Sequence, residues 1–282
     1  MRGVPMRRAK AWTSLLLGCA CVLGWSQGTQ TIRVNGTGSG ITLLKPIAEA
    51  YRRAHPDVRI DLGKPLGSSG AIKALLAGAV DIAISSKPLG PEDSAKGARL
   101  RAYGKTPLAL VAEAEVPVAD LTTRQLEDVL AGRMTRWPQG TPLRLVLRPE
   151  GDSDTQILRA FSPAMNQAMS LAQARPGMLL AVTDPEATVL ISRTQGACGA
   201  SGLASVLGDG FPLKILSFNG VSPTPAALAN GTYPFAKDLH VVITARTSEA
   251  ALAFVDFLYS PQGRALAQTA GVWVTAAAPS GR

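Results

Sequence analysis

Three short polar segments of the sequence contain the residue types that can bind a small anion. They read NGTGSGIT (35–42), GSSGAI (67–72) and RPEGDSDT (148–155), and each leads into a segment with helical spacing. A helix N-terminus presents unpaired N–H groups and the positive end of the helix dipole. Glycine lets a ligand approach the backbone and Ser or Thr hydroxyls add donors, so such junctions bind phosphate-like oxyanions.

Each junction also has an ordinary explanation, because Ser and Asp are common helix N-caps and Gly is a common turn residue. The third junction differs from the others because Arg148 ends the preceding apolar run and can form charge-assisted hydrogen bonds with an anion. The same junction carries Asp152 and Asp154, whose carboxylates repel an anion. Together the three junctions indicate an anion site, in which these two carboxylates need an explanation.

Motifs of common enzyme classes are absent from the sequence. It has no G-x-S-x-G nucleophile elbow and no G-x-x-x-x-G-K-[ST] phosphate loop. His55, His240 and Cys198 are too few for a usual zinc site. Cys198 lies among small residues, which favours a buried small hydrophobe over a nucleophile. We therefore expect no enzyme activity, no metal and no cofactor.

The first 26 residues have the features of an export signal. Four basic residues precede the apolar run AWTSLLLGCACVLG, which is too short for a transmembrane helix. These basic residues are Arg2, Arg7, Arg8 and Lys10. Cleavage after Ser26 predicts a soluble exported chain in the periplasm. Alternatively, the LLGC ending at Cys19 is similar to a lipobox, in which Cys19 would carry a lipid.

The remaining chain carries a modest positive charge. Removal of residues 1–26 takes four of the 29 basic residues and none of the 20 acidic ones, so the net charge falls from +9 to +5. Without a run of Lys and Arg, this excess does not indicate a nucleic-acid partner. Only Cys198 remains, which excludes a disulfide within a monomer.

Strand-like and helix-like segments alternate along the chain, which predicts an α/β fold with mostly parallel sheets. The expected strands cover 31–36, 58–63, 80–86, 107–113, 143–149, 214–220 and 238–245. The expected helices cover 40–55, 69–78, 122–132, 187–196, 225–231 and 248–271, and another begins at Asp154 as its N-cap. The pattern restarts once along the chain, so we expect two lobes.

Several of these segments resemble one known family. GSSGAIKALLAGAVDIAISSKPL (67–89) and LTTRQLEDVLAGRMTRWPQGTPLRLVLR (121–148) carry the most specific likeness. GTGSG, GACGASGLA and SPQGRALAQTAGVWV resemble the family more weakly. The chain resembles the periplasmic phosphate-type substrate-binding proteins of ABC transporters from about Ile32 to Val274.

The resemblance implies a periplasmic-binding-protein-like fold of two α/β lobes joined by two hinge crossovers. Lobe 1 would comprise 31–110 and 236–276, lobe 2 would comprise 111–235, and 277–282 would be a frayed tail. The crossovers would lie near 108–113 and 234–237. A ligand would bind in the cleft, the lobes would close on it, and a membrane permease would recognise the closed monomer.

The resemblance also implies a set of ligand-binding residues. Thr37, Gly38 and Ser39 would act from the first junction, and Ser68, Ser69 and Gly70 from the second. Arg148 would supply the charged contact, with positions 152, 153 and 154 beside it. The ligand would be a small inorganic oxyanion, with phosphate as the first candidate.

Two departures from the family pattern bear on the ligand. An Asp that accepts the proton of hydrogen phosphate is replaced here by Ser86 or Lys87, and the Ser-Gly-Thr of the third loop reads Asp152, Ser153 and Asp154. One carboxylate would replace the lost proton acceptor, or Asp154 caps the helix and Asp152 pairs with Arg148. A different small ligand, or a sensor or scaffold role without a ligand, remains the alternative.

Overall fold

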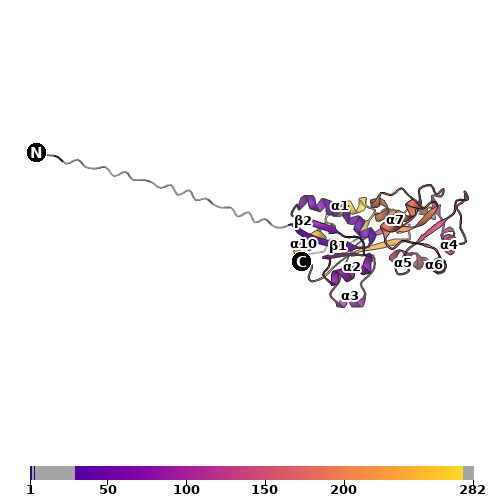
Figure 1. Cartoon of the computed structure of the whole chain (residues 1–282), viewed down its shortest axis with the longest axis horizontal. Coiled ribbons are helices and arrows are strands. Elements are labelled where there is room, and N and C mark those ends of the chain that lie inside the picture. The colour runs from indigo at the N-terminus through magenta and orange to yellow at the C-terminus, as the bar shows by residue number, and fades with distance from the viewer. Residues whose placement is uncertain (2, 4–28, 276–282) are drawn as a thin grey trace.

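The computed structural model describes residues 1, 3 and 29–275 of the chain. The predicted export signal lies outside the described residues except at Met1 and Gly3, and the predicted tail at 277–282 lies wholly outside them. Within the described part, strands and helices alternate as the sequence pattern predicts, and the α/β fold class is confirmed (Figure 1).

The strands are β1 (Gln30–Gly36), β2 (Val58–Leu62), β3 (Ile82–Ser85), β4 (Arg99–Glu113), β5 (Asp120–Leu121), β6 (Arg144–Leu147), β7 (Leu179–Leu180), β8 (Ala197–Gly202), β9 (Leu213–Phe218), β10 (Ala236–Ile243) and β11 (Trp273–Val274). The helices are α1 (Gly38–Ala54), α2 (Gly67–Leu76), α3 (Pro91–Ala95), α4 (Thr123–Ala131), α5 (Ser153–Phe161), α6 (Pro163–Ala174), α7 (Asp184–Arg193), α8 (Leu203–Asp209), α9 (Pro225–Ala229), α10 (Glu249–Tyr259) and α11 (Pro261–Thr269).

The long strand β4 connects two groups of strands. Its first part, Arg99–Pro107, pairs antiparallel with β10, while Leu108–Ala112 pairs antiparallel with β8. On one side β1 pairs in parallel with β2 and β3, and on the other β6 pairs in parallel with β7 and β8. The predicted parallel pairs are therefore joined through antiparallel pairs made by β4 and β10.

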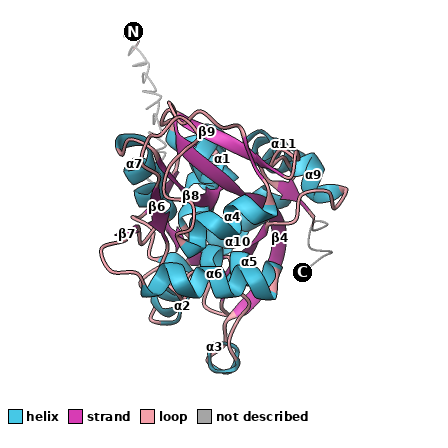
Figure 2. Ribbon diagram, turned by 90° about the vertical axis from the view of Figure 1, so that its right-hand side faces the viewer, coloured by secondary structure: helices cyan, strands magenta, loops and turns pink. Residues whose placement is uncertain are grey.

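Two large hydrophobic cores lie at opposite ends of β4. Tyr103 belongs to the core that α1, α10 and α11 build on β1, β3 and β10. Leu108 and Leu110 belong to the core formed with α4, α5 and α6, which pack together on one face (Figure 2). The burial of large apolar side chains on both sides of Pro107 stabilises each half separately.

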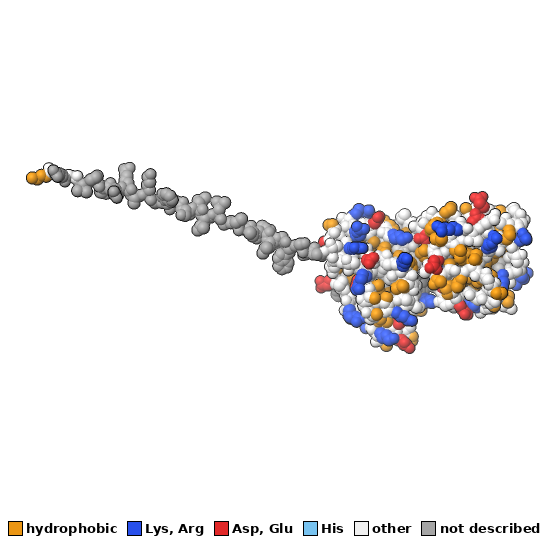
Figure 3. Space-filling view, viewed as in Figure 1, with side chains coloured by type: hydrophobic (Ala, Val, Ile, Leu, Met, Phe, Trp, Pro, Cys, Tyr) orange, Lys and Arg blue, Asp and Glu red, His pale blue; other side chains and the backbone are white. Residues whose placement is uncertain are grey.

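The surface gives no sign of a strongly charged patch on the face seen in Figure 3, where Lys and Arg side chains alternate with Asp and Glu. No helix within the described residues is long and apolar enough to cross a membrane.

Local signals in the sequence set several helix ends. Thr122 caps α4 through a reciprocal capping box with Gln125, and Gly132 ends the helix in the left-handed conformation. His55 lies at the C-cap of α1. Helices α6 and α8 were not predicted, although Ser162 caps α6 and Pro163 begins it.

We predict that Gly36→Ala destabilises the fold at the end of β1. An added Cβ would lie 2.5 Å from the carbonyl oxygen of Ile84 on β3, so the two strands must move apart. We expect a loss of about 1–3 kcal/mol in the free energy of unfolding, measured by denaturant titration. Gly90→Ala is the matched control, because its Cβ meets only Asp93 at 3.7 Å. Equal stability of the two variants would contradict the prediction.

Candidate anion-binding site

The first predicted junction lies at the start of α1, where the two halves of the molecule meet. Thr37 is the N-cap residue, but its side chain makes no capping bond to the helix. Gly38 and Ser39 form the first turn and are buried. A Cβ on Gly38 would lie 2.7 Å from Oδ2 of Asp184, so glycine is required by the close approach of a carboxylate from α7.

Asp184 occupies the anion position of this helix N-terminus. Its Oδ2 accepts from the Ser39 N–H at 3.3 Å, and its Oδ1 accepts from the Ser39 hydroxyl at 2.9 Å and the Gly202 N–H at 3.2 Å. The hydroxyls of Thr37 and Ser201 lie at 3.5 Å. The carboxylate is 1% exposed, so these donors replace its solvation by water.

Lys237 on β10 connects this carboxylate to the third junction. Its Nζ lies 2.7 Å from Oδ1 of Asp184 and 2.7 Å from Oδ1 of Asp154, and the side chain is fully buried. An ammonium group so far from water requires such partners, because the desolvation of an unpaired charge costs several kcal/mol.

Arg148 lies directly after β6 with only 5% of its side chain exposed. Its Nη2 donates to Asp152 Oδ2 at 3.0 Å and to the Val182 carbonyl at 3.2 Å. Oδ2 of Asp154 lies 3.7 Å from its Nη1, and Oδ2 of Asp184 lies 3.9 Å from its Nη2. Within the described residues, its Nε and Nη1 have no hydrogen-bond acceptor.

The two carboxylates of the third junction have different roles. Asp152 is the N-cap of α5, accepts from the Asp154 N–H at 2.9 Å, and pairs with Arg148 as one alternative expected. The prediction that Asp154 caps the helix is wrong, because α5 begins at Ser153 and its N-cap is Asp152. The Ser153 hydroxyl lies 3.5 Å from Asp154 Oδ1, while Asp154 Oδ2 has no hydrogen-bond partner within the described part.

The buried charges shift the pKa values of the two inner carboxylates in opposite directions. Burial, together with the neighbouring Asp184 and Asp152 carboxylates, raises the pKa of Asp154 to about 6 against the opposing charges of Lys237 and Arg148. Burial also acts to raise the pKa of Asp184, but Lys237, Arg148 and the Gly202 N–H outweigh it and hold that pKa well below the usual range. Asp184 is therefore ionised near neutral pH.

The second junction is less occupied by other side chains. Helix α2 begins at Gly67 without a side-chain cap, and Ser69 is exposed. The Ser68 hydroxyl accepts from the Ser86 N–H at 2.8 Å. The Ser86 hydroxyl is buried and has no partner among the described residues.

Lys87, the residue after Ser86, contacts the third junction through its side chain. The ammonium group of Lys87 donates to the carbonyl of Gly151, which precedes the cap of α5. Gly70 lies in the first turn of α2, where a Cβ would meet Leu66 at 3.0 Å.

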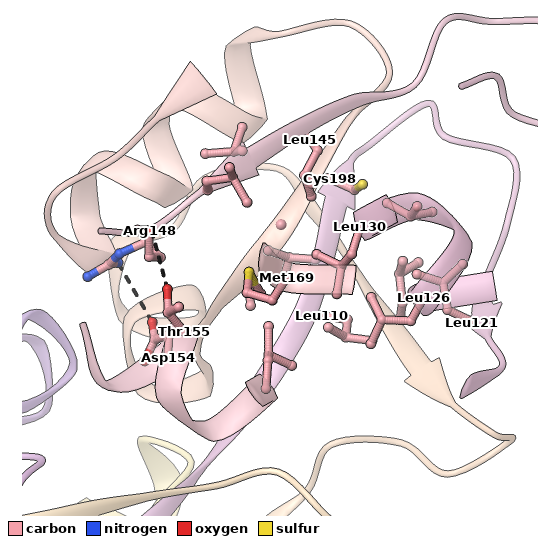
Figure 4. A pocket seen from close by; sticks show the side chains of 18 residues that line it. Leu110, Leu121, Leu126, Leu130, Leu145, Arg148, Asp154, Thr155, Met169 and Cys198 are labelled. Carbon is pink, nitrogen blue, oxygen red and sulfur yellow. Dashed lines mark hydrogen bonds and ion pairs between the residues drawn. The ribbon is translucent and has the colours of Figure 1, made fainter. Parts of the chain in front are cut away.

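A small cavity lies behind Arg148, within the core of the half that contains β6. Its volume is about 30 Å³, comparable to the share of liquid volume that one water molecule takes. Figure 4 shows Arg148, Asp154 and Thr155 at one end and leucines at the other. The lining of the cavity is mostly apolar, so the candidate site remains the region where the first and third junctions meet.

Comparison with known proteins identifies the family. Residues 23–262 match the family described as the PBP superfamily domain. The chain belongs to this superfamily.

Curated relatives and solved structures agree with this assignment. Phosphate-binding protein PstS of Borreliella burgdorferi is 23% identical over 268 residues, which cover 92% of this chain and 94% of that protein. Phosphate-binding protein PstS 2 of Streptococcus agalactiae is 27% identical over 134 residues. That match covers 48% of this chain and spans 42% of the length of the relative.

Two solved structures show the same fold as this PBP superfamily member. A Clostridium perfringens protein solved with bound phosphate has a TM-score of 0.74 at 21% identity, covering 88% of this chain and 100% of its own. An ABC-type phosphate transport receptor of Vibrio cholerae has a TM-score of 0.61 at 21% identity, covering 87% and 100%. The predicted two-lobed periplasmic-binding-protein-like fold is thereby confirmed.

The structure of this superfamily member brings the first and third junctions together. Thr37, Gly38 and Ser39 lie against Asp184, and Lys237 links Asp184 to Asp154 beside Arg148. Within the described residues, the side chains of Ser68 and Ser69 make no hydrogen bond or ion pair with this cluster. Cys198 is buried, as expected, and burial raises the pKa of its thiol to about 12.

Sequence reasoning missed two residues of this charged cluster, Asp184 and Lys237. The hydrophobic pattern predicts a helix from 187, but α7 begins three residues earlier, at Asp184. The capping box of Thr183 and Glu186 sets this start. Recognition of that T-x-x-E pattern would have placed Asp184 in the first helical turn. Lys237 lies on the buried face of β10, in alternation with the buried Phe235 and Leu239. A single lysine on such a face indicates a buried ion pair.

We predict that Lys237→Met strongly destabilises the protein. The substitution leaves the buried carboxylates of Asp154 and Asp184 without their shared cation, so we expect a loss of about 3–5 kcal/mol in unfolding free energy. Lys105→Met is the control on the exposed pair with Asp238, and we expect a loss of about 1 kcal/mol or less.

A further substitution tests whether uncompensated buried charge causes the loss of stability in Lys237→Met. Adding Asp154→Asn to Lys237→Met removes one of the two uncompensated carboxylates, so part of the lost stability should return. Equal losses for Lys237→Met and Lys105→Met in urea titrations would contradict the buried-charge explanation.

Proposed function

We propose that the chain is an extracytoplasmic solute-binding protein that captures a small oxyanion, with phosphate as the first candidate, for uptake by an ABC permease. The PBP superfamily membership and the names of the relatives support this role. The role involves ligand capture and no chemical conversion.

The observation that carries the proposal is the presence of buried, unpaired hydrogen-bond donors on Arg148. Its guanidinium is almost fully buried, yet Nε and Nη1 find no acceptor within the described residues. A buried donor without a partner costs about 1–3 kcal/mol. An oxyanion beside the guanidinium would give an acceptor to one of these donors and form a charge-assisted hydrogen bond with it.

Lobe closure is the proposed response to the ligand. We assign 31–110 and 236–276 to lobe 1 and 111–235 to lobe 2. The change of partners along β4 between Pro107 and Leu108 supports a hinge there. The second crossover lies at 234–237, where Ala236 pairs with Pro107. Rotation at these two points would open the cleft between α1 and α5.

Export is part of the same proposal. The chain would carry a signal peptide over residues 1–26 and act in the periplasm as a monomer, with no nucleic-acid partner and no cofactor. Lipid attachment at Cys19 is the alternative form of export. The ABC permease would recognise the closed form of the protein.

A second candidate is a sensor or scaffold that keeps the fold without an inorganic ligand. The observation that favours it is the Asp184 carboxylate, which takes the donors at the N-terminus of α1. Direct binding measurements separate the two candidates.

We predict that Arg148→Ala reduces phosphate affinity at least about 100-fold, equivalent to about 2.7 kcal/mol. The reason is the loss of the charged donors at the site, and isothermal titration calorimetry gives the measurement. Arg144→Ala is the control, because this exposed arginine on the same strand donates to the Gln195 carbonyl. Phosphate binding that survives Arg148→Ala would refute the proposed site.

A panel of anions tests the function itself. Phosphate, arsenate and sulfate should each be titrated into the wild-type protein, and a bound anion should raise the melting temperature. Absence of any response in both measurements would favour the sensor or scaffold role.

We also predict that Asp154 makes phosphate binding depend on pH. With its pKa near 6, Asp154 is ionised at pH 8 and neutral at pH 5. The ionised form places one more negative charge beside Arg148 and weakens anion binding. We expect Asp154→Asn to bind phosphate roughly tenfold more tightly than wild type at pH 8 and about equally at pH 5.

Comparison of the two proteins at each pH removes the effect of the ionisation of phosphate itself, which is the same for both. Asp152→Asn would not serve as the control, because it removes the carboxylate that pairs with Arg148. An affinity ratio that stays constant from pH 5 to pH 8 would show that Asp154 does not titrate in the free protein.

A further inference from the structure

The N-terminus of α1 already holds an anion, and that anion belongs to the protein. Asp184 accepts from the N–H and the hydroxyl of Ser39 through different oxygens, and from the Gly202 N–H and Lys237. Backbone donors, a hydroxyl and a cation at one position form the donor set that an oxyanion needs. A carboxylate fills this set with two oxygens and one negative charge.

Among the described residues, the buried charges around this position sum to a net negative charge. Arg148 and Lys237 supply two positive charges, while Asp152, Asp154 and Asp184 supply three negative charges when ionised, which gives a net charge of −1. An added oxyanion would face like charges at short range, which disfavours its charged form. Binding is favourable only if one carboxylate leaves or becomes neutral.

Asp184 is the carboxylate whose departure frees the largest number of donors. Asp152 is held by its capping of α5, and Asp154 contacts Lys237, the Ser153 hydroxyl and, at 3.7 Å, Nη1 of Arg148. Asp184 instead reaches from α7 to α1 across the proposed cleft. Its contacts with Ser39 and Lys237 break when the lobes separate, while those with Ser201 and Gly202 lie within the proposed lobe 2 and remain. Oδ2 of Asp184 also lies 3.9 Å from Arg148 Nη2. The carboxylate therefore lies beside the guanidinium whose Nε and Nη1 have no acceptor within the described residues.

We propose that Asp184 is an internal competitor of the oxyanion, which takes the ligand's position at the N-terminus of α1 and must be displaced before the ligand binds. Asp184 thereby sets the affinity of the site for anions. This inference rests on the proposed function, because it assumes that the cleft captures an oxyanion.

Further contacts between the same halves support a cleft that closes without ligand. Asp209 at the end of α8 accepts from the Thr42 hydroxyl at 3.4 Å and lies 3.6 Å from the ammonium group of Lys45, both on α1. Lys87 donates to the Gly151 carbonyl. The contacts of Asp209 hold α1 against the other half beside Asp184, in the position that a bound oxyanion would otherwise stabilise.

The test is the phosphate affinity of Asp184→Asn. The amide can keep hydrogen bonds to Ser39 and Lys237, but it carries no charge and competes less well for the helix N-terminus. We expect phosphate to bind roughly tenfold more tightly, or better, than to the wild type in calorimetry at pH 7.5. Asp184→Ser, which removes the carboxylate with a smaller side chain, should show the same direction of change and covers the case in which the amide variant does not fold.

Asp209→Asn is the matched control. It removes one negative charge from another contact between α1 and the other half, away from the N-terminus of α1. We expect its phosphate affinity to stay within about twofold of wild type, because Asp209 contacts Thr42, Thr188 and Lys45 and none of the donors around Asp184. Small-angle scattering adds a second measurement, in which Asp184→Asn without ligand should be more extended than wild type and contract on addition of phosphate.

The outcomes separate this inference from the proposed function. If wild type binds phosphate and Arg148→Ala does not, while Asp184→Asn and Asp184→Ser bind equally or more weakly than wild type, Asp184 supports the ligand and the competitor role is wrong. If Asp209→Asn raises affinity as much as Asp184→Asn, the effect is one of general charge and the inference also fails. If neither wild type nor any Asp184 variant binds phosphate, arsenate or sulfate, the proposed function itself fails.

Discussion

The ammonium group of Lys237 is the buried charge around which the two halves of the molecule are arranged. It lies on β10, the strand that pairs with both β3 and β4, and it has no exposed surface. Its two partners come from α5 and α7 in the other half of the chain. A charge without water must be matched by opposite charge and hydrogen bonds, so the requirement of one side chain brings α1, α5, α7 and β10 to the same place.

The close backbone approach around this charge explains why glycine occurs at specific positions. A Cβ on Gly202 would lie 2.1 Å from the Ser39 hydroxyl, and a Cβ on Gly38 would meet Asp184. Both glycines leave room for donors to converge on one carboxylate. Close packing between segments that lie far apart in the sequence therefore requires glycine at positions 38 and 202.

The sequence predicted the local features of this arrangement better than the long-range ones. Hydrophobic spacing, the capping box at Thr122 and the Arg148 junction are short-range signals, and the structure contains the corresponding elements. Asp184 and Lys237 gain their roles only because chain segments separated by 53 residues meet, and Thr37 meets Asp184 across 147 residues. No periodicity in a local window carries that information.

The error at Asp154 has a similar cause. Asp152 and Asp154 are equally good N-caps by residue type. Which of them caps α5 depends on which carboxylate pairs with the buried Lys237. Asp154 is taken by the buried lysine, so Asp152 remains to cap α5. Propensity alone cannot distinguish two aspartates when tertiary charge pairing decides between them.

The attachment of Asp184 to the same chain as its donors has a thermodynamic consequence. A tethered group meets its partner at an effective concentration set by geometry, which for short flexible connections is on the order of millimolar. The concentration of free anion that occupies half of the molecules therefore rises with this effective concentration and falls with the anion's own affinity for the donors. A tethered carboxylate thus acts as a built-in threshold, and the geometry of α7 relative to α1 determines the external concentration at which the protein begins to respond.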